Sequence, residues 1–362
     1  MSKTVAILTG GGDCPGLNAV IRAVVRAAIL RRGWRIVGIE YGFNGLVEGP
    51  RWRELDLKGV RGILQRGGTI LGSSNRGDPF AYPVKRNGQT VLEDVSELVL
   101  GNFRKIGADV LIVVGGDGSL KIARRFGELG IPVIGVPKTI DNDLRGTDLT
   151  FGFTTAVRTV TESLDRLHST AESHDRVMVV EVMGRDAGWI ALASGIAGSA
   201  DVILIPEIPY RVDKICAAIR ARSESGSRFS IVVVAEGATP AGGDKIVQKS
   251  AKENFGVERL GGVAHHLARQ IETCLDMESR VVVLGHVQRG GTPAAYDRIL
   301  SSRFGVKAVE MIAAGEFGKM VAIHGDQVVS VDIAAAVGGL KLVDPEGELV
   351  ATAEALGIMV GR

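Results

Sequence analysis

Short apolar runs, separated by amphipathic stretches, recur along this 362-residue chain. The runs are rich in Val and Ile and lack the polar alternation of a half-exposed strand. Uninterrupted runs of this kind are typical of strands buried on both faces, as in a parallel sheet covered by helices. The predicted strands are residues 5–8, 35–39, 110–114, 131–136, 177–182, 202–206, 230–235 and 281–285.

The stretches between the runs include helices with clear stop signals. Residues 18–33 carry an apolar stripe and end in arginines and a glycine, and residues 119–130 also end in glycine. A surface excursion at 239–262 is followed by a predicted helix at 263–275. Because strands alternate with helices and the chain is long for one core, we expect an α/β fold of two doubly wound lobes, with mostly parallel sheets flanked by helices.

Composition and charge exclude several classes of partner. Apolar residues make up 45% and charged residues 23%, which is ordinary for a globular protein. The 43 basic and 41 acidic residues form no block of like charge, so we expect neither nucleic acid nor a membrane surface as partner. The N-terminus lacks a signal-peptide pattern and the apolar runs are too short to span a bilayer, so we expect a cytoplasmic location.

The three cysteines, Cys14, Cys216 and Cys274, are widely spaced. Their odd number and spacing predict neither a disulfide framework nor a metal site, and they fit a reducing cytosol. Cys14 lies in a glycine-rich loop without a neighbouring general base, so we predict that it is a small packing residue and not a nucleophile.

Two glycine-rich loops, TGGGDCPGLN at 9–18 and GGDGS at 115–119, each follow a predicted strand and precede a predicted helix. Such loops expose backbone N–H groups at a helix N-terminus, where an anion can bind. The first loop is equally compatible with an ordinary tight turn, and it matches neither a Walker A motif nor G-x-G-x-x-G. In the second loop, Asp117 favours a cation that accompanies a phosphate, because Mg²⁺ takes a few carboxylates plus phosphate oxygens.

The densest polar run is VPKTIDNDLRGTD, at 136–148, directly after a predicted strand. In an extended segment Asp141 and Asp143 would face the same side, about 7 Å apart. One could serve Mg²⁺ while the other accepts a proton from a substrate hydroxyl. A solvated acidic loop is the alternative, although active sites of open α/β sheets lie where such strands end.

A second polar group follows the last predicted strand. His286 and Arg289, three residues apart between glycines, suit a doubly charged phosphate. Together with the acidic run, they predict a Mg²⁺-dependent phosphotransferase that acts on a phosphorylated hydroxy compound.

The motifs GGDGS, PKTIDND, VEVMGRDAGW, PE at 206–207 and LGHVQRGGTPAAYDR follow one another in a characteristic order and spacing. In this they resemble the 6-phosphofructokinases of the bacterial ATP/pyrophosphate family, over nearly the whole chain. The resemblance implies ATP-dependent phosphorylation of fructose 6-phosphate at its 1-hydroxyl, which gives fructose 1,6-bisphosphate in glycolysis. It also implies a nucleotide-binding lobe and a sugar-phosphate-binding lobe, formed by residues 1–152 plus about 288–338 and by residues 153–287 plus about 339–362 respectively.

The resemblance assigns chemical roles position by position. Asp141 matches the general base, and Thr139 matches a substrate-positioning residue. Asp117 and Asp143 match the Mg²⁺ carboxylates. Further positions match groups around the transferring phosphoryl, namely Gly11, Arg76 and Arg185.

The remaining candidate residues are expected to bind the two substrates. The donor site would also include Gly116, Gly118, Ser119 and Lys138. The sugar contacts would be Met183, Gly184 and Glu236, and the contacts to the 6-phosphate would be Arg176, Arg280, His286 and Arg289. In the family Arg176 and Arg280 reach in from a neighbouring subunit, which implies a homotetramer or homodimer.

Two positions bear on the phosphoryl donor. Gly118 leaves room for the α-phosphate of ATP, which an Asp there would block and repel, whereas Lys138 is typical of pyrophosphate-dependent enzymes. A block excludes ATP, while an added cation near a phosphate excludes neither donor, so ATP is the predicted donor. We expect Lys138 to lie close to the transferable phosphates. The combination resembles the mixed-substrate, longer-chain branch of the family.

Three alternatives remain. The first is a pyrophosphate-dependent enzyme of the same fold. The second is a non-catalytic sugar-phosphate or nucleotide sensor, which the intact set of acidic residues and Arg185 disfavours. The third is a lipid or NAD kinase, which would share GGDGS but not PKTIDND or LGHVQRGG.

Overall fold

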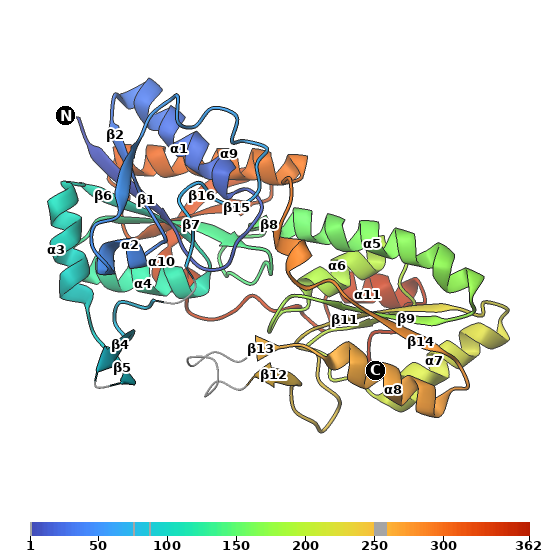
Figure 1. Cartoon of the computed structure of the whole chain (residues 1–362). Helices are drawn as coiled ribbons and strands as arrows, with labels where there is room; N and C mark the ends of the chain where they lie inside the picture. The colour runs from blue at the N-terminus through green and yellow to red at the C-terminus, as the bar shows by residue number, and fades with distance from the viewer. Residues whose placement is uncertain (1, 75–76, 87, 250–258) are drawn as a thin grey trace. The chain divides into compact units, whose positions relative to one another are not determined.

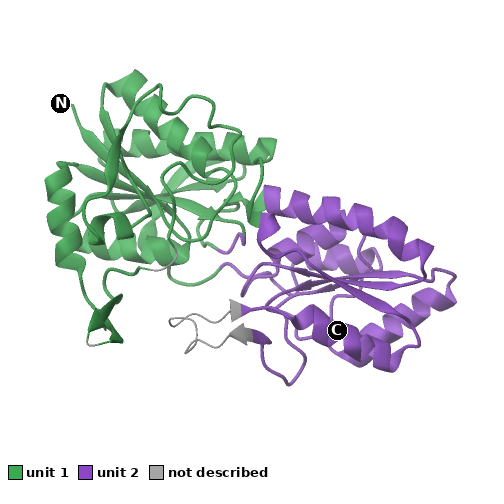
Figure 2. Cartoon of the chain, in the orientation of Figure 1, with its two compact units in different colours: residues 1–140, 144–154, 289–340 green, residues 141–143, 155–288, 341–362 purple. Residues whose placement is uncertain are grey.

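The computed structural model describes residues 2–74, 77–86, 88–249 and 259–362. The chain divides into two units, each assembled from three stretches of sequence (Figure 2). Unit 1 comprises Met1–Ile140, Leu144–Thr154 and Arg289–Leu340. Unit 2 comprises Asp141–Asp143, Thr155–Gln288 and Lys341–Arg362. Each unit is built around its own sheet (Figure 1).

The sheet of unit 1 is mostly parallel. Its strands are β1 (Thr4–Thr9), β2 (Arg35–Ile39), β3 (Trp52–Leu55), β6 (Val110–Gly115), β7 (Val133–Thr139), β8 (Phe151–Gly152), β15 (Lys319–His324) and β16 (Gln327–Asp332). They run in the order β16-β15-β7-β6-β1-β2-β3, and β8 pairs with β7. The edge strands β3 and β16 are antiparallel to their neighbours, and the pairs from β15 to β2 are parallel. The first four predicted strands are confirmed.

Helices cover both faces of this sheet (Figure 1). They are α1 (Leu17–Arg32), α2 (Asn44–Val47), α3 (Ser96–Ile106), α4 (Asp117–Glu128), α9 (Ala295–Ala314) and α10 (Ile333–Ala336). α1 packs along α9 on one face. On the other face, Ala6 and Leu8 of β1 join a core with side chains of α2, α3, α4 and α10. α1 confirms the predicted helix at 18–33, whereas α4 begins at Asp117, two residues before the predicted start. A separate hairpin consists of β4 (Tyr82–Arg86) and β5 (Gln89–Glu93).

The sheet of unit 2 is parallel throughout. Its strands are β9 (Val177–Val182), β10 (Val202–Leu204), β11 (Ser230–Ala235) and β14 (Ser279–Val283), in the order β10-β11-β9-β14. One face packs on α7 (Val212–Glu224) and α8 (Val263–Cys274), which confirms the helix predicted at 263–275. The other face carries α5 (Phe153–Ser173), α6 (Trp189–Ala197) and α11 (Glu348–Ala355) (Figure 1). A short hairpin is formed by β12 (Val247–Lys249) and β13 (Arg259–Leu260).

One prediction about the cysteines is wrong. Cys216 on α7 and Cys274 on α8 form a disulfide, with their Cα atoms 6.5 Å apart. The two residues are 58 positions apart in sequence and meet because both helices cover the same face of the sheet, which spacing alone does not reveal. The prediction for Cys14 is confirmed, because its side chain is buried and its thiol donates to the carbonyl of Phe151 at 3.2 Å. Burial raises the pKa of the Cys14 thiol.

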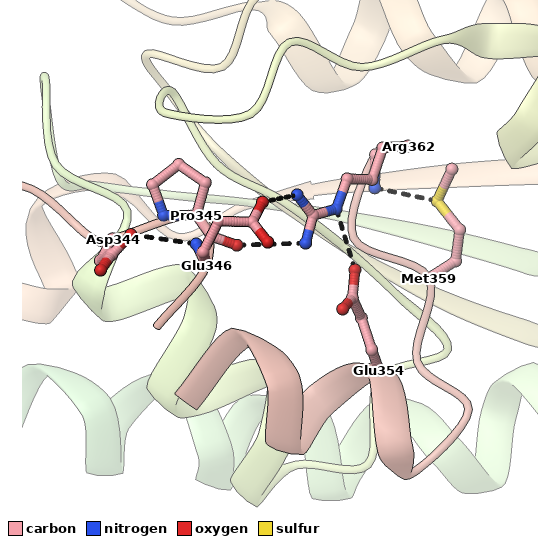
Figure 3. Close-up of polar contacts among 7 residues, drawn as sticks. Asp344, Pro345, Glu346, Glu354, Met359 and Arg362 are labelled. Carbon is pink, nitrogen blue, oxygen red and sulfur yellow. Dashed lines mark hydrogen bonds and ion pairs between the residues drawn. The ribbon is translucent and has the colours of Figure 1, made fainter. Parts of the chain in front are cut away.

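The C-terminal stretch of unit 2 is fastened at its last residue. Figure 3 shows the Arg362 guanidinium facing the carboxylates of Glu346 and Glu354 and the carbonyl of Pro345. Met359 bonds alongside β10, since its carbonyl accepts from the N–H of Ile203 at 2.9 Å. These contacts hold the chain end against the sheet.

The fold class is the predicted one: α/β, with mostly parallel sheets flanked by helices. In the parts of the chain that the structure describes, no helix is both long and apolar enough to cross a lipid bilayer.

Candidate functional site

The glycine-rich loops and the polar run at 136–148 begin at the same edge of the unit 1 sheet. The loops follow β1 and β6, and Lys138 and Thr139 end β7. These three strands are parallel neighbours in the order β7-β6-β1, so their carboxyl ends lie side by side. The structure therefore brings these predicted residues together where open α/β sheets bind ligands.

The two loops touch each other. A Cβ on Gly10 would lie 2.6 Å from the Ser119 Oγ, so only glycine fits there. Gly11 has a φ of 79°, in the left-handed region that favours glycine. Glycines without side chains let a phosphate approach the backbone N–H groups of such loops closely.

Lys138 reaches the first loop. Its side chain is 3% exposed and its Nζ donates to the Gly12 carbonyl at 2.7 Å. A Cβ on Gly11 would lie 3.1 Å from the same Nζ. The buried ammonium thus lies against the loop predicted to receive phosphate.

The second loop leads directly into α4. Gly116 is the N-cap, and Asp117, Gly118 and Ser119 form the first turn. Their N–H groups are at the positive end of the helix dipole. A Cβ on Gly118 would meet none of the described residues within 4 Å, so the described fold has open space at this position.

Asp117 has the features of a cation ligand. Its Oδ2 accepts a hydrogen bond from Lys121 at 2.7 Å, whereas its buried Oδ1 has no hydrogen-bond partner among the described residues. A buried carboxylate oxygen without a partner is costly, and a bound cation would satisfy it.

The segment Asp141–Asp143 is not extended, so the expected geometry of an extended strand was wrong. Asn142 has a φ of 54°, so the backbone turns between the two aspartates. Asp141 is only 5% exposed. The carbonyl of Asp143 accepts a hydrogen bond from the N–H of Lys341 at 2.8 Å. Asn adopts this left-handed conformation more readily than most residues. Asn142 was therefore a sequence signal for a turn, which the interpretation based on the two aspartates did not use.

Arg289 lies in unit 1 beside the first loop. Its Nη1 donates to the Asp13 carbonyl at 3.2 Å and would lie 3.1 Å from a Cβ on Gly12. Its predicted partner in 6-phosphate binding, His286, is exposed in the turn after β14 in unit 2. Sequence reasoning also overlooked Asp13, whose buried Oδ1 has no hydrogen-bond partner in the part of the chain that the structure describes. The signal was present, since Asp13 is the only charged residue of the first loop.

In unit 2, a loop at Met183–Gly188 joins β9 to α6 and carries two of the predicted sugar contacts, Met183 and Gly184. Its backbone is unusual, with a φ of 146° at Gly184 and 53° at Arg185. The N–H of Arg185 donates to Glu236 at 3.3 Å, so two predicted site residues meet. A Cβ on Gly237 would lie 1.7 Å from the Arg185 carbonyl, so only glycine fits. We call this segment the acceptor loop.

The two other predicted phosphate-binding arginines also meet in unit 2. Arg176 precedes β9 and Arg280 lies in the adjacent strand β14, and both pair with Glu278. Hydrogen bonding from Arg176, with the nearby charge of Arg280, lowers the pKa of the Glu278 carboxyl. Sequence reasoning did not find Glu278. Arg76, the remaining candidate, lies outside the described residues.

A cleft of about 520 Å³ lies elsewhere in unit 1, lined by residues that include Ile131, Val133 and Phe317. Val133 begins β7, so this cleft borders the amino end of a strand whose carboxyl end carries Lys138 and Thr139. It is not part of the candidate site.

Glycine-rich loops at the carboxyl ends of adjacent parallel strands, with acidic and basic side chains around them, define a phosphate-binding α/β protein. The family model described as Phosphofructokinase matches residues 4–312. The chain therefore belongs to the phosphofructokinase family.

Relatives of similar length carry two different donor names. The chain is 56% identical over 358 residues to ATP-dependent 6-phosphofructokinase 2 of Clostridium perfringens, covering 98% of both chains. It is also 51% identical over 358 residues, 99% of each chain, to the pyrophosphate–fructose 6-phosphate 1-phosphotransferase of Streptomyces coelicolor. Among solved structures, the Pichia pastoris phosphofructokinase in the T-state is similar, with a TM-score of 0.80 and 32% identity over 99% of this chain and 37% of that longer chain.

Proposed function

We propose that this member of the phosphofructokinase family transfers the γ-phosphoryl group of ATP to the 1-hydroxyl of fructose 6-phosphate. The observation that carries the proposal is the meeting of both glycine-rich loops, the α4 N-terminus and Lys138 at one sheet edge. The high identity to a relative named as ATP-dependent supports the donor.

The donor half-site is assigned to unit 1. The N–H groups of the loops and of the first turn of α4 bind the phosphates of ATP. Gly118 leaves space at this turn, which accommodates the α-phosphate. Lys138 holds the first loop through Gly12 and adds positive charge next to the phosphates.

Asp141 and Asp117 have separate tasks in the proposed reaction. Asp141 accepts the proton of the 1-hydroxyl as that oxygen attacks the γ-phosphorus. Asp117 and Asp143 would hold Mg²⁺, and the buried Oδ1 of Asp117 fits this role. When bound, Mg²⁺ neutralises charge on the phosphate oxygens. Thr139 positions the acceptor, and Arg185 and Arg76 stabilise the transferring phosphoryl group.

The acceptor half-site is assigned to unit 2, apart from Arg289, which belongs to unit 1. Met183, Gly184 and Glu236 contact the sugar in this proposal. The 6-phosphate is bound by arginines and a histidine, namely Arg176, Arg280, His286 and Arg289. Arg176 and Arg280 serve the site of a neighbouring subunit, so the protein works as a homotetramer or homodimer. The proposed location is the cytoplasm.

Pyrophosphate is the second candidate donor. The placement of the Lys138 ammonium against Gly12 supplies a buried cation that a compact, highly charged donor would use. The Streptomyces coelicolor relative is named for this activity. Open space at Gly118 favours ATP, because nothing in the described fold blocks a longer donor there.

The test of the proposed function is identification of the product. Purified protein is incubated with Mg²⁺, ATP and fructose 6-phosphate, and the phosphates are followed by ³¹P NMR. We expect a new phosphomonoester on C1 and a matching amount of ADP. ATP hydrolysis without sugar phosphorylation, or binding without turnover, would contradict the proposal and favour the sensor alternative.

A further inference from the structure

The acceptor loop has a backbone that its surroundings must hold in place. Arg185 is not a glycine, yet its φ of 53° lies in the left-handed region. Such conformations persist only where neighbouring groups fix them, and they concentrate at functional sites. The groups that hold the loop in this conformation therefore determine the position of Arg185.

Glu207 fixes the end of the acceptor loop. Both of its carboxylate oxygens accept from the N–H of Gly188, at 2.9 and 3.1 Å. Gly188 is the N-cap of α6, so the negative charge lies at the favourable end of the helix dipole. A Cβ on Gly188 would lie 2.8 Å from Oε2 of Glu207 and 2.4 Å from the Ile205 Cβ, so the close approach requires glycine.

The same carboxylate also holds the C-terminal stretch of unit 2. Oε1 of Glu207 accepts from the N–H of Val343 at 2.8 Å. Next to it, Nε1 of Trp189 donates to the carbonyl of Lys341 at 2.8 Å. The far end of this stretch is fastened through Arg362 (Figure 3). Glu207 thus joins the acceptor loop to an anchored segment.

Two other side-chain bonds to the loop backbone are longer than those of Glu207. Gln288 accepts from the N–H of Met183 and Glu236 accepts from that of Arg185, each at 3.3 Å. Both bonds from Gly188 to Glu207 are shorter than these two, and Glu207 lies in the PE motif at 206–207, for which no role has been assigned.

We propose that Glu207 is a positioning residue for fructose 6-phosphate: by joining Gly188 to Val343 it holds the acceptor loop in the conformation that binds the sugar phosphate. The inference rests on the proposed function of the acceptor loop. Burial raises the pKa of the Glu207 carboxyl, and Asp186 adds to this, while the bonds from Gly188 and Val343 act in the opposite direction. The N–H donors therefore help to keep the carboxylate charged in its half-buried place.

The test compares Glu207→Ala, which removes the acceptor, with Glu207→Gln, which keeps one acceptor oxygen. Two N–H groups lose their partner in Glu207→Ala, so we expect KM for fructose 6-phosphate to rise about tenfold. KM for ATP should change less than about twofold, and Glu207→Gln should recover part of the loss. If Glu207→Ala does not fold, Glu207→Gln is measured alone and should still raise KM for fructose 6-phosphate selectively.

Asp201→Asn is the matched control. Asp201 also lies in unit 2, accepts from the N–H of Ile231 at 2.8 Å, and has a pKa raised by burial. The Asp201→Asn substitution should lower the melting temperature and leave the KM values for ATP and fructose 6-phosphate unchanged. Unchanged KM for fructose 6-phosphate in the Glu207 variants, or an equal rise in both KM values, would overturn the inference.

Arg185→Ala, measured in parallel, separates this inference from the proposed function. If Arg185→Ala keeps wild-type turnover, the assigned role of the acceptor loop is wrong. If it loses turnover while the Glu207 variants bind fructose 6-phosphate normally, only the role of Glu207 is wrong.

Discussion

The two half-sites are built in different ways. In unit 1 the site consists mainly of backbone, at the ends of three neighbouring strands, with glycines that let two loops touch. In unit 2 the acceptor loop is held by side chains from distant parts of the chain, namely Glu207, Glu236 and Gln288. A site made of backbone groups can be predicted from the order of the strands and the positions of the glycines. A site held by side chains depends on tertiary contacts, which leave little trace in the local sequence.

The largest expected effect comes from replacing Asp141, the proposed general base. Asp141→Asn removes the proposed base and should lower kcat about a thousandfold. Steady-state kinetics with saturating ATP and fructose 6-phosphate measure this. Asp148→Asn is the control, since Asp148 belongs to the same polar run and its carboxylate accepts from the N–H of Gly325 at 2.7 Å. Turnover that survives in Asp141→Asn would mean that another group is the base.

Gly118→Asp should damage only the donor half-site. A side chain there meets open space, so the melting temperature should not change. The added carboxylate repels the phosphates of ATP, and we expect KM for ATP to rise about a hundredfold with KM for fructose 6-phosphate unaltered. Gly118→Ala controls for the loss of glycine. Equal damage to both KM values would contradict the division of tasks.

Gly237→Ala is the corresponding test in the acceptor half-site. The new Cβ would lie 1.7 Å from the Arg185 carbonyl, so the acceptor loop must shift. KM for fructose 6-phosphate should rise about tenfold while KM for ATP stays constant. Gly101→Ala, where a Cβ would meet no described residue within 4 Å, should leave both values unchanged. A wild-type KM for fructose 6-phosphate in Gly237→Ala would show that the loop conformation is unimportant.

The disulfide of unit 2 should have the smallest effect on kinetics. It closes a loop of 58 residues between α7 and α8, so reduction should lower the melting temperature by about 10 °C without changing either KM. Thiol titration checks the bond itself. Native protein should expose no reactive thiol, because Cys14 is buried and the others are paired. Two reactive thiols in native, unreduced protein would show that the bond does not form.

The sequence predicted the fold class and the edge of the sheet that carries the donor half-site, because apolar runs, glycines and helix stop signals are local. It did not predict the turn at Asn142, since the acidic pattern suggested an extended segment. The disulfide and the contacts of Glu207 could not be predicted from the sequence either, because they join residues that only tertiary packing brings together. The roles of Asp141, Arg185 and the other site residues stay predictions.

The most direct test of the central claim is the ratio of kcat/KM for ATP to that for pyrophosphate, measured with fructose 6-phosphate and Mg²⁺ in the purified protein. Open space at Gly118 predicts a ratio well above one. Robust turnover with pyrophosphate and none with ATP would contradict it, and would make the Lys138 ammonium at the first loop the feature that selects the donor.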